Sequence, residues 1–169
     1  IGSLNAVVET YDMPVIVSAH PRTAKRLEAL SGTALDRRVR RMEPFGFHDY
    51  NHLQKNALCV ISDSGTIAEE AAILGFAAIT PRDAIERPEA LDAGCIMMTG
   101  FERETMIAGI ENATRLFAQN EAAGASHPVP ADYCVTDTSQ RVLKFILSTA
   151  RVSNVWDGIR DNDPVIFCE

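Results

Sequence analysis

The amino-acid sequence predicts a three-layer α/β fold built on a parallel sheet. Short apolar runs of strand-forming residues alternate with longer segments of helical period, and this alternation is typical of βα units. Each apolar run is followed by a turn former or a polar residue. A chain of 169 residues is long enough to bury one sizeable core but short for two. We therefore expect residues 1–169 to form a single α/β domain.

Five apolar runs are expected to be strands, because each is short and bounded by polar or turn-forming residues. They are Val15–Ala19, Val39–Met42, Cys59–Ser62, Ala77–Thr80 and Cys95–Thr99. Six segments before, between and after these runs are expected to be helices. They are Leu4–Tyr11, Thr23–Leu30, Asp49–Asn56, Thr66–Leu74, Pro88–Ala93 and Glu104–Ala118.

The C-terminal part of the chain is expected to contain a loop, a helix and a tail. A glycine and two prolines lie among small and polar residues in Gln119–Thr138, which favours a surface loop. Apolar residues then recur at helical spacing and predict a helix over 139–156, whose apolar stripe must pack on something. For the tail at 157–169, a short strand and a disordered end both stay open.

The composition argues against several classes of partner. The formal net charge of −7 gives no positive field for a nucleic-acid backbone, so we expect no nucleic-acid partner. No apolar run approaches the roughly 20 residues that cross a bilayer, so we expect no membrane partner. The four cysteines are far apart and form no C-x-x-C pair, which favours free thiols and a cytoplasmic location.

The most informative stretch follows the predicted strand that begins at Cys59. A tight Ser64-Gly65 turn leads into a helix that opens at Thr66. The unpaired amides and the dipole of a helix N-terminus suit a phosphate, Ser64 adds a hydroxyl donor, and Gly65 permits close approach. Glu69 and Glu70 come one turn into the helix, where a carboxylate could accept two hydrogen bonds from the vicinal hydroxyls of a ribose. This arrangement predicts a nucleoside-diphosphate site.

A simpler interpretation is that Asp63 and Ser64 only cap the helix, with both glutamates on a solvated face. A second polar loop, from Arg82 to Glu89, favours the nucleotide site, because it follows the next strand at the edge where α/β sheets bind ligands. Arg87 in this loop could neutralise a diphosphate with its planar fork. The alternative for this loop is an ordinary cluster of surface ion pairs.

These motifs resemble the non-hydrolysing UDP-N-acetylglucosamine 2-epimerases and their relatives that act on 6-deoxy UDP-sugars. The resemblance rests on Ser62-Asp63-Ser64-Gly65 with Glu69-Glu70, and on Arg82-Asp83 with Glu86-Arg87-Pro88-Glu89. It implies a Rossmann-like domain similar to the C-terminal half of a two-domain enzyme of the glycosyltransferase-B type. We expect Ile1 to lie inside a longer chain, with the amino-terminal domain before it.

The resemblance also implies seven substrate-binding residues, which are Phe45, Tyr50, Ser64, Gly65, Thr66, Glu70 and Arg87. In the family pattern, Ser64 and the amides of Gly65 and Thr66 bind the UDP phosphates. Arg87 lies beside the diphosphate and the sugar. Many members have a second glycine where this chain has Thr66, and the threonine points to the subgroup that acts on 6-deoxy sugars.

The rest of the nucleotide is assigned by the same resemblance. Glu70 binds the ribose hydroxyls, Tyr50 stacks near the uracil, and the backbone of Phe45 reads the edge of the base. Stacking on an aromatic ring and a carboxylate on the ribose are also reasonable on physical grounds.

The implied reaction inverts C2 of the sugar by elimination of UDP and its re-addition on the other face. It needs no cofactor and no metal. His48 and His52 are spaced as in a zinc motif, but no third ligand follows, so no metal site is expected. The groups that move the C2 proton are expected in the amino-terminal domain, so the isolated chain should be inactive.

Two other functions stay open. The chain could be the donor-binding domain of a glycosyltransferase, which would transfer the sugar to an acceptor, or a non-catalytic module that binds a UDP-sugar. All three functions share the UDP-sugar as the expected partner.

The order of the strands predicts a gap in the sheet. In a doubly wound domain the first strand lies between the second and the fourth, and the helix at Leu4–Tyr11 would follow that strand. We therefore expect the gap to be filled in one of three ways. Either the neighbouring strands pair directly, or the segment Val165–Cys168 is recruited, or a second copy associates to give a homodimer.

Overall fold

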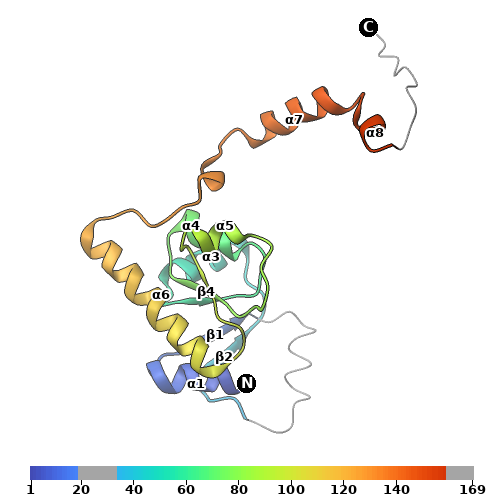
Figure 1. The fold of residues 1–169 in the computed structure, drawn as a ribbon. Coiled ribbons are helices and arrows are strands. Elements are labelled where there is room, and N and C mark those ends of the chain that lie inside the picture. The colour runs from blue at the N-terminus through green and yellow to red at the C-terminus, as the bar shows by residue number, and fades with distance from the viewer. Residues whose placement is uncertain (19–33, 159–169) are drawn as a thin grey trace. The chain divides into compact units, whose positions relative to one another are not determined.

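The computed structural model describes residues 1–18 and 34–158, and it confirms the predicted α/β class (Figure 1). Strands are found at all five predicted places. They are β1 (Val15–Ser18), β2 (Val39–Met42), β3 (Val60–Ile61), β4 (Ala78–Thr80) and β5 (Met97–Met98). The strands β3 and β5 are shorter than predicted, because only the residues that pair with β4 belong to the ladder.

Helices begin close to their predicted residues in the described part of the chain. They are α1 (Gly2–Tyr11), α3 (Phe47–Asn56), α4 (Ile67–Leu74), α5 (Pro88–Asp92), α6 (Arg103–Ala123), α7 (Thr138–Thr149) and α8 (Ser153–Trp156). A short 3-10 helix spans Ala131–Cys134. The helix predicted at Thr23–Leu30 lies outside the described residues.

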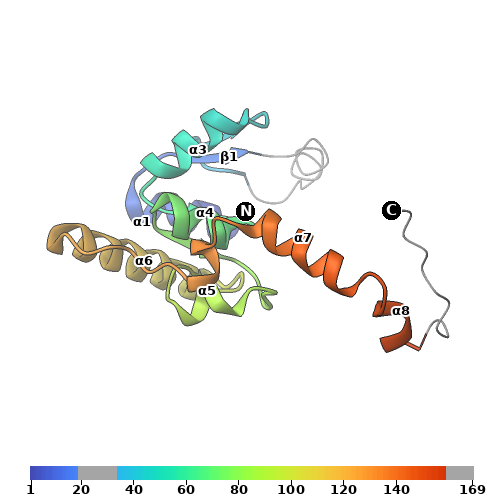
Figure 2. The same cartoon turned by 90° about the horizontal axis from the view of Figure 1, so that it is seen from above.

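Three layers are built around the parallel sheet β3-β4-β5. Successive side chains of β4 point to opposite faces, as strand geometry requires. Ala78 packs in a cluster with residues of α4 and α5, whereas Ile79 packs in a second cluster with residues of α1 and α6. The N-terminal part of α6 lies beside α1, as Figures 1 and 2 show from two directions. The central strand is therefore covered on both faces.

The sheet is interrupted where the strand order predicts a gap. Strands β1 and β2 form a separate parallel pair, with Val15 opposite Val39, and within the described residues β1 is not paired with β3. A cleft of about 700 Å³ is lined by residues of β1, β3, α1 and α3. The expectation that the neighbouring strands pair directly is therefore wrong, because they remain on opposite sides of this cleft. The alternative segment, Val165–Cys168, lies outside the described residues.

The long helix α6 continues into the segment predicted to be a loop. It includes Gln119–Ala123 and ends where Gly124 adopts a left-handed conformation with φ of 62°. Glutamine, glutamate and alanine are good helix formers, and a left-handed glycine is the commonest helix terminator. The predicted loop thus begins only at the glycine.

The chain divides into two compact units, residues 1–133 and 134–169. In the second unit, the single helix predicted over 139–156 is instead the two helices α7 and α8. The hydroxyl groups of Ser148 and Thr149 donate to the carbonyls of Lys144 and Phe145, at 2.7 and 2.8 Å. Such bonds compete with the backbone ladder and favour a helix end at this point.

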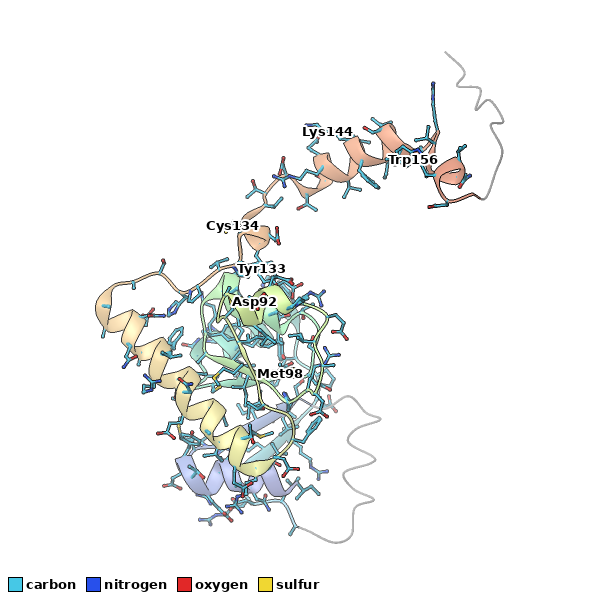
Figure 3. All side chains as sticks on the ribbon, viewed as in Figure 1. Asp92, Met98, Tyr133, Cys134, Lys144 and Trp156 are labelled. Carbon is cyan, nitrogen blue, oxygen red and sulfur yellow. The ribbon has the colours of Figure 1, made fainter. Side chains whose placement is uncertain are left out.

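The apolar stripe predicted for the C-terminal helix is present on α7, but it is exposed. Phe145 and Leu147 are each 69% exposed, and Trp156 of α8 is 71% exposed. Figure 3 shows Lys144 on α7 and Trp156 on α8. No helix within the described residues is both long and apolar enough to cross a membrane.

We expect Gly109→Ala to destabilise the domain by about 1–3 kcal/mol, as overpacking of a core does. Gly109 lies on α6 against the sheet, and a Cβ atom there would overlap Cγ2 of Thr99, which is buried. Gly2→Ala is the matched control, because no described atom beyond its chain neighbours and its own helix backbone lies within 4 Å of the added Cβ. Urea unfolding checks the difference, and equal midpoints for the two variants would contradict it.

Candidate functional site

The loop between β3 and α4 is folded by its own hydroxyl groups. The amide of Ser64 donates to Oγ of Ser62 at 3.1 Å, and Oγ of Ser64 accepts a hydrogen bond from the amide of Thr66 at 3.3 Å. Thr66 is the N-cap residue of α4 and its side chain makes no capping bond. Ser64 therefore has a partly structural role, as the simpler interpretation expects, but it remains exposed.

The guanidinium of Arg87 lies directly over Gly65. A Cβ atom at Gly65 would be 3.1 Å from Nη1 of Arg87, which is closer than ordinary van der Waals contact. Nε of Arg87 forms an ion pair with Oε1 of Glu69 at 2.6 Å, and the two side chains are only 36% and 30% exposed. Glu69 thus fixes the direction of the arginine fork and is not on a freely solvated face.

Glu70 points to other partners. Its Oε1 accepts a hydrogen bond from Oγ1 of Thr66 at 2.7 Å, and its Oε2 accepts one from Nε2 of Gln54 at 2.6 Å. The hydroxyl groups of Thr66 and Ser64 are 3.0 Å apart. A continuous network therefore joins the loop, the first turn of α4, and α3.

The aromatic residues predicted for the base lie at the start of α3 and just before it. Phe45 and Tyr50 line the same cleft as Ser64 and Gln54. Burial is the main cause that raises the pKa of Tyr50, the nearby charge of Glu70 raises it further, and a hydrogen bond with the side chain of Ser62 opposes the shift. The phenol is therefore neutral at ordinary pH and lies close to the network of Glu70.

Three segments bring the predicted residues together. Phe45 and Tyr50 come from the region before and within α3, and Arg87 comes from the loop after β4. The remaining predicted residues, Ser64, Gly65, Thr66 and Glu70, come from the loop after β3 and from α4. Hydroxyl groups and a cationic fork lie on one side of this arrangement and suit an anion. A carboxylate on the other side suits hydroxyl donors.

Three features of this region are not among the residues and roles predicted from sequence: Gln54, the pairing of Glu69 with Arg87, and Tyr133. Gln54 follows Tyr50 by four residues, so helical spacing could have placed both on one face of α3. Tyr133 donates from its hydroxyl to Oε1 of Glu89 at 3.0 Å, and burial with this bond raises its pKa to about 12. Figure 3 labels Tyr133 near Asp92 of α5. No sequence pattern in the predicted loop that contains Tyr133 indicates its hydrogen bond with Glu89.

A metal centre is not suggested by the part of the chain that the structure describes, where no three His, Cys, Asp or Glu side chains gather as ligands. The groups that the site does offer are hydroxyls, the guanidinium of Arg87, and the carboxylates of Glu69 and Glu70. They can bind and orient a phosphorylated ligand and stabilise negative charge on it.

Known proteins share both the sequence pattern and the fold. Residues 1–147 match the protein family described as UDP-N-acetylglucosamine 2-epimerase. The chain is 37% identical over 108 residues to the UDP-N-acetylglucosamine 2-epimerase of Methanocaldococcus jannaschii, an alignment that covers 62% of this chain and 30% of that protein.

Solved structures give the same result. A UDP-N-acetylglucosamine 2-epimerase from Rickettsia bellii superposes with a TM-score of 0.76 at 37% identity, over 92% of this chain and 42% of that one. The Methanocaldococcus jannaschii enzyme in complex with UDP-GlcNAc and UDP has a TM-score of 0.60 at 34% identity, over 67% of this chain and 32% of that one. The chain thus spans less than half the length of these relatives.

Proposed function

Because this chain belongs to the UDP-N-acetylglucosamine 2-epimerase family, we propose that it is the nucleotide-binding part of an isomerase acting on a UDP-N-acetylhexosamine. The observation that carries the proposal is the position of Arg87 over Gly65, beside the network of Ser64, Thr66 and Glu70. The chain spans under half of its relatives, so the proposed activity is that of the whole protein.

In the proposed reaction, a base removes the C2 proton while the bond from C1 to the UDP oxygen breaks. The electrons of the C2–H bond form the double bond between C1 and C2, and UDP leaves with the electron pair of its bond. Return of UDP to C1, with a proton delivered to the other face of C2, gives the inverted sugar. The groups that move the proton are not assigned within this chain.

The role of this chain is to hold UDP and to stabilise it as it departs. The diphosphate gains negative charge when the C1–O bond breaks, and preorganised donors lower that barrier. Ser64, the amides of Gly65 and Thr66, and Arg87 are the proposed donors. Glu69 keeps the fork of Arg87 in place over Gly65, so little reorganisation is needed when the charge develops.

The nucleoside is held by a different set of groups. We assign the ribose hydroxyls to the carboxylate of Glu70, and the uracil to Tyr50 and the backbone of Phe45. Tyr50 and Phe45 line the cleft beside Ser64, which supports a base next to the phosphates.

Deuterium incorporation tests the proposed function. The full protein is incubated in deuterated water with UDP-GlcNAc and, because of Thr66, separately with its 6-deoxy analogue, in both cases without an acceptor. An epimerase places deuterium at C2 and returns a UDP-sugar, because the proton is exchanged with solvent. The isolated chain is the control and should give no exchange.

The two alternative functions have other outcomes in that experiment. A glycosyltransferase would transfer the sugar once an acceptor is added and would incorporate no deuterium at C2. A non-catalytic module would bind UDP and return the sugar unlabelled. Either result would contradict an epimerase.

We expect Glu70→Ala to weaken the affinity of the full protein for UDP by about 1.5–3 kcal/mol, the usual effect of losing charge-assisted hydrogen bonds. Glu69→Ala should have a smaller effect, since Glu69 contacts Arg87 and is not assigned to the ribose. Calorimetric titration with UDP compares the variants. An equal or larger loss for Glu69→Ala would reverse the assignment of the two carboxylates.

The homodimer and the cytoplasmic location are also part of the proposal. Cys59 and Cys95 are free thiols, which supports a reducing compartment. The unjoined strands β1 and β3 and the exposed stripe of α7 support association of two copies. We expect sedimentation of the full protein to give the mass of a dimer, and a single-copy mass at micromolar concentration would contradict this.

A further inference from the structure

Gln54 is a buried polar side chain that the proposed function does not yet use. It is 3% exposed and is the only buried residue of α3. Its Nε2 donates to Oε2 of Glu70 at 2.6 Å, while its Oε1 is buried and has no partner among the described residues. Because an ionised carboxylate can only accept, the amide nitrogen must be the atom that faces Glu70.

The position of this glutamine is not explained by stability. A buried amide oxygen without a hydrogen bond costs free energy relative to an apolar group of the same shape. A leucine or methionine would remove that cost and still fill the space. The bond to Glu70 is therefore the feature that the glutamine contributes.

That bond completes the support of the Glu70 carboxylate. Thr66 holds one oxygen and Gln54 holds the other, and each oxygen keeps a lone pair for a further donor. The last torsion of a glutamate side chain is otherwise broad, so an unsupported carboxylate rotates. With both partners in place, its free lone pairs keep one direction, and two neighbouring hydroxyl groups of a ligand can meet them together.

We propose that Gln54 is a positioning residue that orients the carboxylate of Glu70 toward the vicinal ribose hydroxyls of the UDP-sugar. This inference rests on the proposed function, which assigns the ribose to Glu70. It makes the pair of Gln54 and Glu70 the element that distinguishes a ribonucleotide from a nucleotide without those hydroxyls.

Calorimetric titration of the full protein with UDP and with 2′,3′-dideoxy-UDP tests the role of Gln54. The variants are Gln54→Leu and Gln54→Met, which keep the size of the side chain and remove the amide. Gln119→Leu is the matched control, since Gln119 is exposed on α6. Urea unfolding of each variant is measured in parallel.

We expect both Gln54 variants to bind UDP about tenfold more weakly, the size of one charge-assisted hydrogen bond. Their affinity for the dideoxy nucleotide should change by less than about twofold, because only bonds to the ribose hydroxyls are weakened. In a Glu70→Ala background, Gln54→Leu should cause no further loss. A merely structural role would weaken the binding of both nucleotides alike.

Two results overturn the inference in different ways. If the unaltered protein prefers UDP to the dideoxy nucleotide but the Gln54 variants keep that preference, the positioning role is wrong and the proposed function stands. If the unaltered protein binds both nucleotides equally or binds neither, the assignment of Glu70 to the ribose fails, and the role of Gln54 fails with it.

Discussion

The parallel pairing of β3 with β4 is the constraint on which the site depends. The register that sets Val60 opposite Ala78 and Ile61 opposite Ile79 brings the carboxyl ends of the two strands level. The loops that follow must then leave the same edge of the sheet, where α/β proteins bind ligands. Arg87 can lie over Gly65 only because of this register, although the two residues are far apart in sequence. The packing of Ile79, which is fully buried, holds the register in place.

Two adjacent glutamates on α4 serve different ends of the site. Successive residues on a helix point about 100° apart, so neighbours cannot share one partner. Glu69 turns toward the loop after β4 and holds the cation, whereas Glu70 turns toward α3 and is itself held. The inward face of α4 is closed by small apolar residues such as Ala68 and Ala71. The helix therefore fixes the angle between the proposed phosphate side and the proposed ribose side.

The strands and the two loops of the site could be predicted from sequence because the signals are local. Apolar runs mark the strands, and the Ser64-Gly65 turn and Arg87 follow consecutive strands. Helical spacing places Gln54 on the face of Tyr50, but α3 is mostly polar, so only the contact with Glu70 shows which polar residue is buried. The predicted end of α6 is wrong because four of the five residues before Gly124 are good helix formers, and the glycine decides the end. The gap in the sheet could be predicted from strand order. That β1 and β3 stay apart across a cleft could not, because pairing between distant strands is not encoded in a local pattern.

The buried polar atoms without a partner among the described residues are not spread through the domain. They are Gln54 Oε1, Glu69 Oε2 and Thr80 Oγ1. Thr80 ends β4, Glu69 lies in the first turn of α4, and Gln54 contacts the next residue of that helix. None of the three belongs to the apolar clusters that cover the two faces of the sheet. Unpaired buried polar atoms cost free energy. All three lie at or near the edge of the sheet where β4 ends, and departures from ideal packing are expected at functional sites. The residues of β4 before Thr80 pack in the two apolar clusters that stabilise the fold, and Arg87 of the candidate site lies in the loop after Thr80.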